Sequence, residues 1–177
     1  MGGMKIGNLD GIIDLRGGLL PAGPWEYARR ELSDLGPDGP LRWLGVHHTA
    51  APVAWSTPRA IARYHVISLG WPGIGYHFVV GDDGRIFYVG DILTIRYNVA
   101  GQNDKVVGVC LSGDFTQRAP PPKQLEAARD LLANLQYALG WAVPIMGHRE
   151  IALQGWGTAC PGDTFLEGRR WKDALLP

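Results

Sequence analysis

Three histidines and a cysteine are the side chains of this chain with the clearest capacity for chemistry. His47 and His48 end a segment rich in Leu, Trp and Val, His148 follows a second apolar segment, and Cys160 stands 12 residues later. Imidazole and thiolate groups are preferred zinc ligands, and three protein ligands with one open position are typical of a catalytic zinc site. No compact zinc motif such as H-E-x-x-H is present. Taken alone, the histidines could equally be structural or surface residues, and the cysteine could be a small buried side chain.

The predicted strands decide which of these side chains can meet. Side chains alternate across a strand, so only one of His47 and His48 can point into any one pocket. Ligands at the ends of separate strands are what a site at the rim of a sheet requires. Such a site would need the predicted strands before His47 and His148 to end at the same rim.

The hydrophobic pattern predicts a single α/β domain with a central mixed β-sheet flanked by helices. Residues 76–80 and 85–89 flank a Gly-Asp-Asp-Gly loop, which predicts a β-hairpin. The other predicted strands are 41–48, 106–111 and 143–146, and the predicted helices are 24–35, 58–69, 122–139 and 164–176. Residues 147–163 are expected to form a loop. We expect residues 1–40, an extended arm followed by the first helix, to pack on a domain that spans 41–177.

Composition excludes several classes of protein. A chain of 177 residues with 46% hydrophobic and 19% charged residues is typical of a folded domain, not of a disordered chain. The 17 basic and 17 acidic residues give zero net charge, which argues against a nucleic-acid binder. Two cysteines are too few for a disulfide scaffold. Neither a signal peptide nor a membrane-spanning run is found, so we expect a soluble protein, made in the cytoplasm and without membrane contact. We also expect a monomer.

Six short strings extend this interpretation. In chain order they are Val46-His47-His48-Thr49-Ala50, Gly75-Tyr76-His77-Phe78, Asp83-Gly84-Arg85, Val107-Gly108-Val109-Cys110-Leu111-Ser112-Gly113, Gly147-His148-Arg149-Glu150 and Thr158-Ala159-Cys160-Pro161-Gly162. Together they closely resemble the type 2 N-acetylmuramoyl-L-alanine amidases, a family that includes phage lysozyme-type amidases and animal peptidoglycan-recognition proteins. Each string alone is loose, but six in order are specific. The resemblance covers about residues 41–176 and implies the fold of that family.

The resemblance implies a zinc hydrolase. The family's three zinc ligands match His47, His148 and Cys160, and its catalytic tyrosine matches Tyr76. The tyrosine hydroxyl can donate a hydrogen bond to the attacking water or to the developing oxyanion. Thr158 matches a position of lysine or threonine, where a hydroxyl could stabilise the oxyanion. Without the resemblance, Tyr76 would fit a core aromatic and Thr158 a loop residue that caps the backbone.

Three polar residues are the expected substrate contacts. Asn103 ends the family's Gly-x-Asn string, and His48 stands where relatives often carry a second histidine that is not a ligand. Relatives commonly have a histidine where this chain has Asn98. An asparagine can hydrogen-bond sugar or peptide but cannot titrate near neutrality.

The remaining polar and aromatic candidates fit the scaffold. His65 is expected to pack on a helix, Cys110 to be a small core residue, and His77 to face away from the site because it alternates with Tyr76. Three tryptophans beside loops could either stack on sugar rings or pack in the fold: Trp55, Trp71 and Trp156.

The preferred interpretation is a zinc-dependent amidase that cleaves the bond between N-acetylmuramic acid and L-alanine in bacterial peptidoglycan. We expect a phage or prophage endolysin, held in the host cytoplasm before its release to the cell wall. The alternative is a module that recognises peptidoglycan without cleaving it, which the retained ligand set argues against. A regulator that binds another protein, such as an RNA polymerase, is a third possibility that the sequence leaves open.

Overall fold

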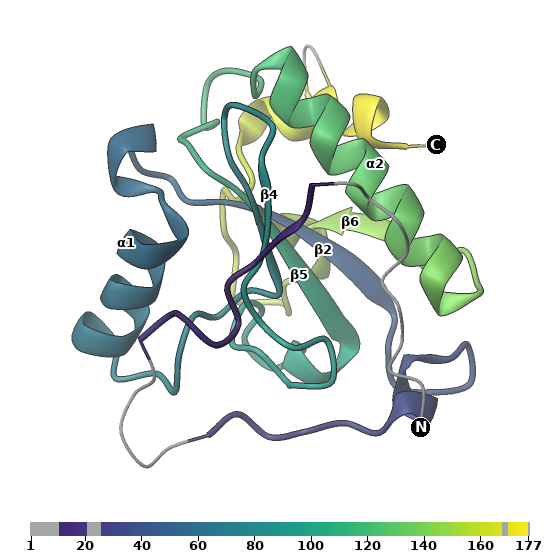
Figure 1. Cartoon of the computed structure of the whole chain (residues 1–177). Coiled ribbons are helices and arrows are strands. Elements are labelled where there is room, and N and C mark those ends of the chain that lie inside the picture. The colour runs from purple at the N-terminus through teal and green to yellow at the C-terminus, as the bar shows by residue number, and fades with distance from the viewer. Residues whose placement is uncertain (1–10, 21–25, 168–169, 177) are drawn as a thin grey trace.

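The chain folds around one mixed sheet of six strands, in a computed structural model that describes residues 11–20, 26–167 and 170–176. The strand order is β1-β4-β3-β5-β2-β6 (Figure 1). The strands are β1 (Ile13–Asp14), β2 (Trp43–His48), β3 (Phe78–Val80), β4 (Ile86–Tyr88), β5 (Val106–Leu111) and β6 (Ile145–Gly147). Strands β3 and β4 pair antiparallel and all other neighbours pair parallel. The predicted mixed sheet is confirmed.

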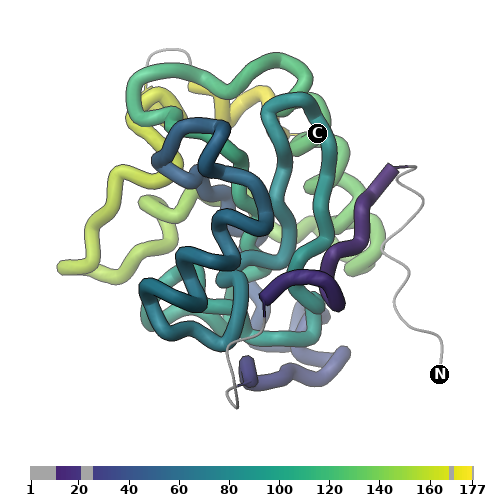
Figure 2. The backbone as a smooth tube through the Cα atoms, turned by 60° about the vertical axis from the view of Figure 1, so that its left-hand side comes forward, coloured from purple at the N-terminus to yellow at the C-terminus, as the bar shows by residue number. Residues whose placement is uncertain are grey.

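Helices cover both faces of the central strands. Helix α2 (Pro122–Leu139) lies on one face, where Leu132 packs in the same core cluster as Val46 of β2. Helix α1 (Pro58–Arg63) lies on the other face and contributes Ile61 to a second cluster (Figures 1 and 2). Every residue of β5 is buried. This burial explains why the strand is apolar along its whole length, as parallel strands between two helical layers are.

The helix-capping residues and the β-hairpin predicted from the sequence are present in the structure. The Thr57 hydroxyl caps α1 by accepting the backbone N–H of Ala60, at 3.2 Å. The helix continues as a π-helical turn over Tyr64–Ser68. Helix α2 ends at Gly140, whose left-handed φ of 76° suits a residue without a side chain. The β-hairpin of β3 and β4 is also confirmed.

The predicted helix over 24–35 is wrong. Its first two residues lie outside the described part of the chain, and the rest is extended apart from a 3-10 turn at Leu32–Leu35. The carbonyl of Ala28 and the amide of Arg30 form backbone hydrogen bonds with segment 93–95. These tertiary hydrogen bonds replace the ones that a local helix would have made.

The predicted helix over 164–176 is also wrong. The structure has separate 3-10 turns at Asp163–Phe165 and Trp171–Leu175, and residues 168–169 between them are not described. Arg170 has a left-handed φ of 40°, which no α-helix can contain. The segment buries three apolar side chains in the core instead: Phe165, Trp171 and Leu175.

Smaller elements complete the fold. The expected loop over 147–163 begins with a short helix, α3 (His148–Ile151). Of the expected N-terminal arm, residues 1–10 are not described, and β1 pairs with β4 at the sheet edge. Further 3-10 turns lie at Val53–Trp55 and Asn103–Lys105. Within the described residues, no helix combines the length and apolar character needed to cross a membrane.

Candidate metal centre and active site

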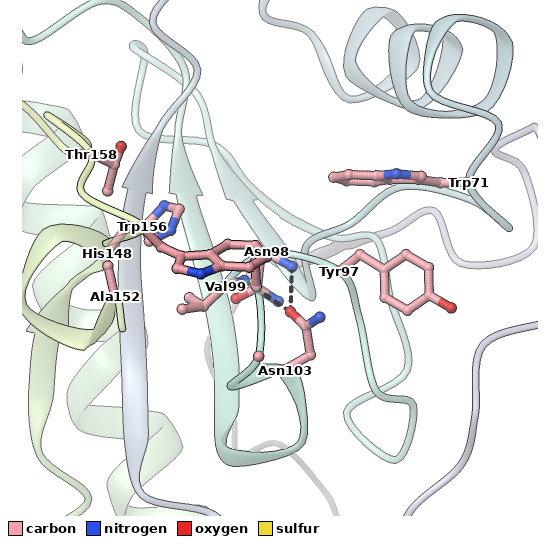
Figure 3. A pocket seen from close by; sticks show the side chains of 11 residues that line it. Trp71, Tyr97, Asn98, Val99, Asn103, His148, Ala152, Trp156 and Thr158 are labelled. Carbon is pink, nitrogen blue, oxygen red and sulfur yellow. Dashed lines mark hydrogen bonds between the residues drawn. The ribbon is translucent and has the colours of Figure 1, made fainter. Parts of the chain in front are cut away.

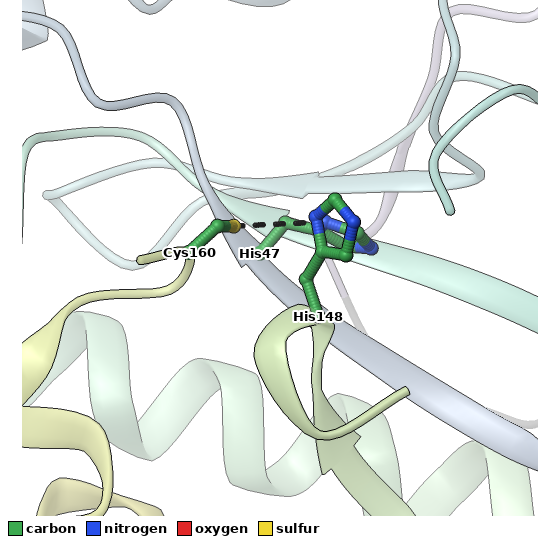
Figure 4. Close-up of side chains that lie close together, drawn as sticks. All are labelled: His47, His148 and Cys160. Carbon is green, nitrogen blue, oxygen red and sulfur yellow. Dashed lines mark hydrogen bonds between the residues drawn. The ribbon is translucent and has the colours of Figure 1, made fainter. Parts of the chain in front are cut away.

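His47, His148 and Cys160 converge at the carboxyl-terminal rim of the sheet (Figure 4). Their potential ligand atoms all lie within 4.8 Å of one another. The Nδ1 atom of His47 is 3.7 Å from the Sγ atom of Cys160, and the two imidazole ring centres are 4.8 Å apart. Two imidazoles and one thiol are a donor set that suits tetrahedral zinc with one position left open.

Strand pairing places the two histidines. Strands β2 and β6 are parallel neighbours with Val46 opposite Gly147. His47 directly follows Val46 and His148 directly follows Gly147, so both histidines lie at the same end of the sheet. His47 and His148 are 101 residues apart in the chain and meet only because β2 and β6 are neighbours in the folded sheet.

The cysteine is held by its loop. The carbonyl of Cys160 accepts the backbone N–H of Arg149 at 2.8 Å, and its Sγ accepts the N–H of His48 at 3.4 Å. Two residues later the chain turns at Gly162, which has a φ of 122°. A Cβ atom at that position would collide with the carbonyl of Phe115. Only glycine therefore lets this loop approach the segment after β5 so closely.

Burial sets the protonation of the three donors. It lowers the pKa of His47 well below its ordinary value, an effect to which His148 adds, and it lowers the pKa of His148. Both rings are neutral near pH 7 and have a lone pair for a cation. Burial raises the pKa of the Cys160 thiol to about 12, so the thiolate form requires a bound cation. The donor set therefore fits a zinc ion.

His48 lies apart from this group. Its side chain is on the α2 face of the sheet, where Nδ1 accepts the backbone N–H of Phe115 at 3.1 Å. Asp114 is 3.9 Å from the same ring atom, and the ring is buried. The strand alternation thus separates the two neighbouring histidines as predicted. His48, expected as a substrate contact, is not among the residues that line the cavity beside the metal centre.

Tyr76 stands next to the metal centre. Its ring centre is 5.2 Å from that of His47. Burial, with Cys110 and Cys160 nearby, raises the pKa of the phenol well above its ordinary value, so the hydroxyl remains a hydrogen-bond donor. The next side chain, His77, points the other way, accepting the N–H of Gly108 at Nδ1, 3.0 Å away. Both residues precede β3. Strand alternation therefore does not explain these positions, because alternation carried back from Val79 would place His77 on the face of His47.

A cavity of about 540 Å³ opens beside the metal centre (Figure 3). Trp71 and Trp156 stand on different sides of it. The side chain of Trp156 is 61% exposed and so is available for stacking. The cavity is lined by Trp71, Tyr97, Asn98, Val99, Ala100, Gly101, Asn103, His148, Ala152, Trp156 and Thr158. Trp55 is exposed elsewhere and does not line it.

The expected polar residues take different positions in this cavity. Thr158 accepts the backbone N–H of Cys160 at Oγ1, 3.1 Å away, which leaves its hydroxyl hydrogen free to donate. Asn103 uses Oδ1 to accept the backbone N–H groups of Asn98 and Val99, both at 2.9 Å, and thereby shapes the cavity wall. Asn98 directs its amide group toward backbone carbonyls.

Part of the cavity wall could not be predicted from the sequence. Tyr97 and Ala152 line it although neither belongs to a recognised string. No periodicity or motif marks these residues, because one lies in a long loop and the other follows a helix of one turn. Their contribution is visible only once the two segments are placed on the same sheet rim.

Comparison with known proteins agrees with this geometry. Residues 37–163 match the family model described as N-acetylmuramoyl-L-alanine amidase (Amidase_2). The chain is 34% identical to peptidoglycan-recognition protein LB of Drosophila melanogaster, over 95% of this chain and 74% of the relative. It is 32% identical to the N-acetylmuramoyl-L-alanine amidase of Homo sapiens, over 72% of this chain but only 23% of that longer protein.

Solved structures show the same fold. The Ph2119 endolysin of a Thermus scotoductus bacteriophage aligns with a TM-score of 0.72 and 27% identity, over 94% of this chain and 99% of the endolysin. A mutant of Drosophila PGRP-LB in complex with tracheal cytotoxin aligns with a TM-score of 0.70 and 28% identity, over 88% of this chain and 90% of that one.

Proposed function

Because the chain belongs to the N-acetylmuramoyl-L-alanine amidase (Amidase_2) family, we propose that it hydrolyses the amide bond between N-acetylmuramic acid and L-alanine in peptidoglycan. One observation carries the proposal. The donor atoms of His47, His148 and Cys160 lie within 4.8 Å of one another. His148 and Thr158 also line an open cavity, so this donor set can be reached by a substrate.

In this proposal His47, His148 and Cys160 hold one zinc ion. When bound, zinc supplies a Lewis acid that polarises the scissile carbonyl and activates water near neutral pH. The two neutral imidazoles and the buried thiol are in the protonation states from which a site of this kind is loaded. Loading releases the thiol proton to solvent.

Tyr76 and Thr158 supply hydrogen bonds at the reacting centre. The raised pKa of Tyr76 keeps its hydroxyl protonated, so that it can donate to the oxygen on which negative charge develops. Thr158 has its acceptor side occupied by the amide of Cys160, which orients its hydroxyl hydrogen away from the loop. Both residues flank the metal-binding group, on the side of His47 and of Cys160 respectively.

The substrate is a muramyl peptide. The cavity wall is mainly apolar and aromatic, which suits the flat faces of a sugar and the aliphatic parts of a stem peptide. A similar protein has been solved with tracheal cytotoxin, which supports a peptidoglycan fragment as occupant. The extensive overlap with a phage endolysin, over 99% of that chain, supports a role as a phage or prophage endolysin.

Product analysis tests the proposal. Purified sacculi are incubated with the zinc-loaded protein, with and without a chelator, and the soluble products are analysed by mass spectrometry. We expect stem peptides with a free N-terminal L-alanine, lost on chelation and restored by zinc.

A second candidate, recognition of peptidoglycan without cleavage, is favoured by the 34% identity to a peptidoglycan-recognition protein. Protein that contains zinc and sediments with sacculi, yet releases no peptide, would establish this alternative and refute the amidase.

A further inference from the structure

Two facing glycines create room above the sheet next to the metal centre. Gly45 of β2 and Gly108 of β5 are directly paired in register. A Cβ atom on Gly45 would lie 3.4 Å from Nε2 of His47, and one on Gly108 would lie 2.9 Å from the Oδ1 atom of Asn98. The His47 ring and the Asn98 carboxamide therefore cover adjacent points of the same bare backbone surface, from β2 and from the loop after β4.

The orientation of the Asn98 carboxamide is set by its own hydrogen bonds. Nδ2 donates to the carbonyls of Arg96, at 3.0 Å, and Gly75, at 3.2 Å. Both acceptors are carbonyls, so the nitrogen and oxygen cannot be exchanged without losing both hydrogen bonds. The backbone N–H of Asn98 is in turn bound by Asn103, which fixes the loop. Oδ1 consequently points away from these carbonyls and needs a donor.

The two atoms above the glycines lack other partners. Oδ1 of Asn98 and Nε2 of His47 are both buried, and neither has another hydrogen-bond partner among the described residues. Burial lowers the pKa of His47, and a side-chain hydrogen bond with Asn98 acts in the opposite direction. A buried acceptor and a buried donor without other partners, placed side by side, would both be satisfied by one hydrogen bond.

We propose that Asn98 is a positioning residue, whose Oδ1 accepts the Nε2–H of His47 and so keeps the Nδ1 lone pair directed at Cys160 and His148. The inference rests on the proposed function only in assigning a metal to His47. A ligating histidine usually donates its other N–H to such a partner, which fixes both its tautomer and its ring orientation. Asn98 thus acts through His47, and its Oδ1 faces the ring instead of the substrate.

Two substitutions isolate the acceptor oxygen. Asn98→Leu and Asn98→Asp are close in size to asparagine, and both remove the Nδ2 hydrogen bonds to Gly75 and Arg96. Only Asn98→Asp keeps an oxygen that can accept the Nε2–H of His47. A difference between the two variants therefore reports on that hydrogen bond and not on the loop.

The first readout needs neither zinc nor activity. Long-range ¹H–¹⁵N spectra of the metal-free protein report which imidazole nitrogen carries the proton, and the His47 signals are assigned by their loss in His47→Gln. We expect the Nε2–H tautomer in the wild-type protein and in Asn98→Asp, and a mixture of tautomers in Asn98→Leu.

The second readout is zinc affinity, measured by competition with a chromophoric chelator. Asn98→Leu is expected to weaken binding about 10- to 100-fold, whereas Leu132→Ala, a core change in α2, leaves it unchanged.

The outcomes separate this inference from the amidase proposal. An Nδ1–H tautomer for His47 in the wild-type protein would overturn it even if Asn98→Leu failed to fold. So would Asn98→Leu with the wild-type tautomer and wild-type zinc affinity. Failure to cleave sacculi would leave the tautomer result intact, because that result is obtained on metal-free protein.

Discussion

The close contact between Cys160 and His47 could in principle serve two chemistries, a metal site or a nucleophilic thiolate paired with an imidazolium. Burial raises the pKa of the thiol to about 12 and lowers that of the imidazole, so the ion pair that a cysteine nucleophile needs is disfavoured at both residues. The neutral pair is instead suited to a cation that displaces the thiol proton. At the scale of single residues, the site is therefore better explained as a set of ligands.

Cys160→Ala should abolish stoichiometric zinc binding, because two imidazoles are left to hold the ion. Activity on sacculi should be lost with the metal. Metal analysis of the dialysed protein measures the occupancy, and Cys110→Ala, which removes the fully buried thiol of β5, should keep one zinc per chain. Full occupancy in Cys160→Ala would show that the ligand has been misassigned.

Tyr76→Phe should retain zinc and lower kcat by about 10²- to 10³-fold, the usual effect of losing one hydrogen-bond donor to a developing oxyanion. The reason is that the raised pKa keeps the hydroxyl protonated and able to donate. Steady-state kinetics on a soluble muramyl peptide measure the effect. Tyr137→Phe, on an exposed tyrosine of α2, serves as the matched control. Equal kcat values for the two variants would remove Tyr76 from the mechanism.

At the scale of elements, the site depends on how three segments meet. Strands β2 and β6 deliver the histidines in parallel register, and the loop after α3 delivers the cysteine. The strands are buried and held by ladder hydrogen bonds, whereas the loop depends on few contacts, notably the tight turn at Gly162. The loop is therefore the element through which a remote substitution should most readily affect the metal.

Gly162→Ala should destabilise the fold by about 1–3 kcal/mol or more, because it adds strain at positive φ and a collision with the carbonyl of Phe115. It should also weaken zinc binding by shifting Cys160. Gly140→Ala is the matched control, because Gly140 has a φ of 76° but open space around its Cα. Gly140→Ala should cost about 1–2 kcal/mol of stability and leave zinc affinity unchanged. Urea unfolding and chelator competition measure the two quantities, and equal zinc affinities would contradict the assigned role of the turn.

At the scale of the whole molecule, the histidines share one electrostatic property. All five are at least partly buried, and burial is the first cause of a lowered pKa at each of them: His47, His48, His65, His77 and His148. The unfolded chain therefore binds more protons than the folded chain in mildly acidic solution. By linkage, the free energy of unfolding should fall as the pH falls.

His65 allows this acid sensitivity to be measured away from the metal ligands. Its pKa is lowered from 6.5 to about 4, so its contribution is fully present above pH 6.5 and is lost as the pH falls toward 4. The loss should be about 3 kcal/mol. Urea unfolding of metal-free protein across this range measures it. His65→Asn, whose Oδ1 can still accept the N–H of Gly75, should show a shallower decline. An identical pH dependence would show that His65 is not the source.

Residue types and their spacing predict the family, the β-hairpin, helix α2 and the separation of His47 from His48. These features follow from local patterns: strings in order, a Gly-Asp loop between apolar runs, a helical stripe ended by Gly140, and the two-residue period of a strand. Each depends on contacts close in the chain or on the fixed geometry of one element. Such information is present in residue types and spacing.

Other features depend on contacts between segments that are distant in the chain. Residues 26–31 are extended because they form hydrogen bonds with segment 93–95, and the C-terminal segment breaks into short turns because its aromatic side chains must reach the core. The orientation of Asn98 beside His47 likewise depends on two glycines of neighbouring strands, 63 residues apart in the chain. Long-range packing overrides local preference at these positions, because hydrogen bonds and burial between distant segments outweigh differences in helix propensity of less than about 1 kcal/mol per residue.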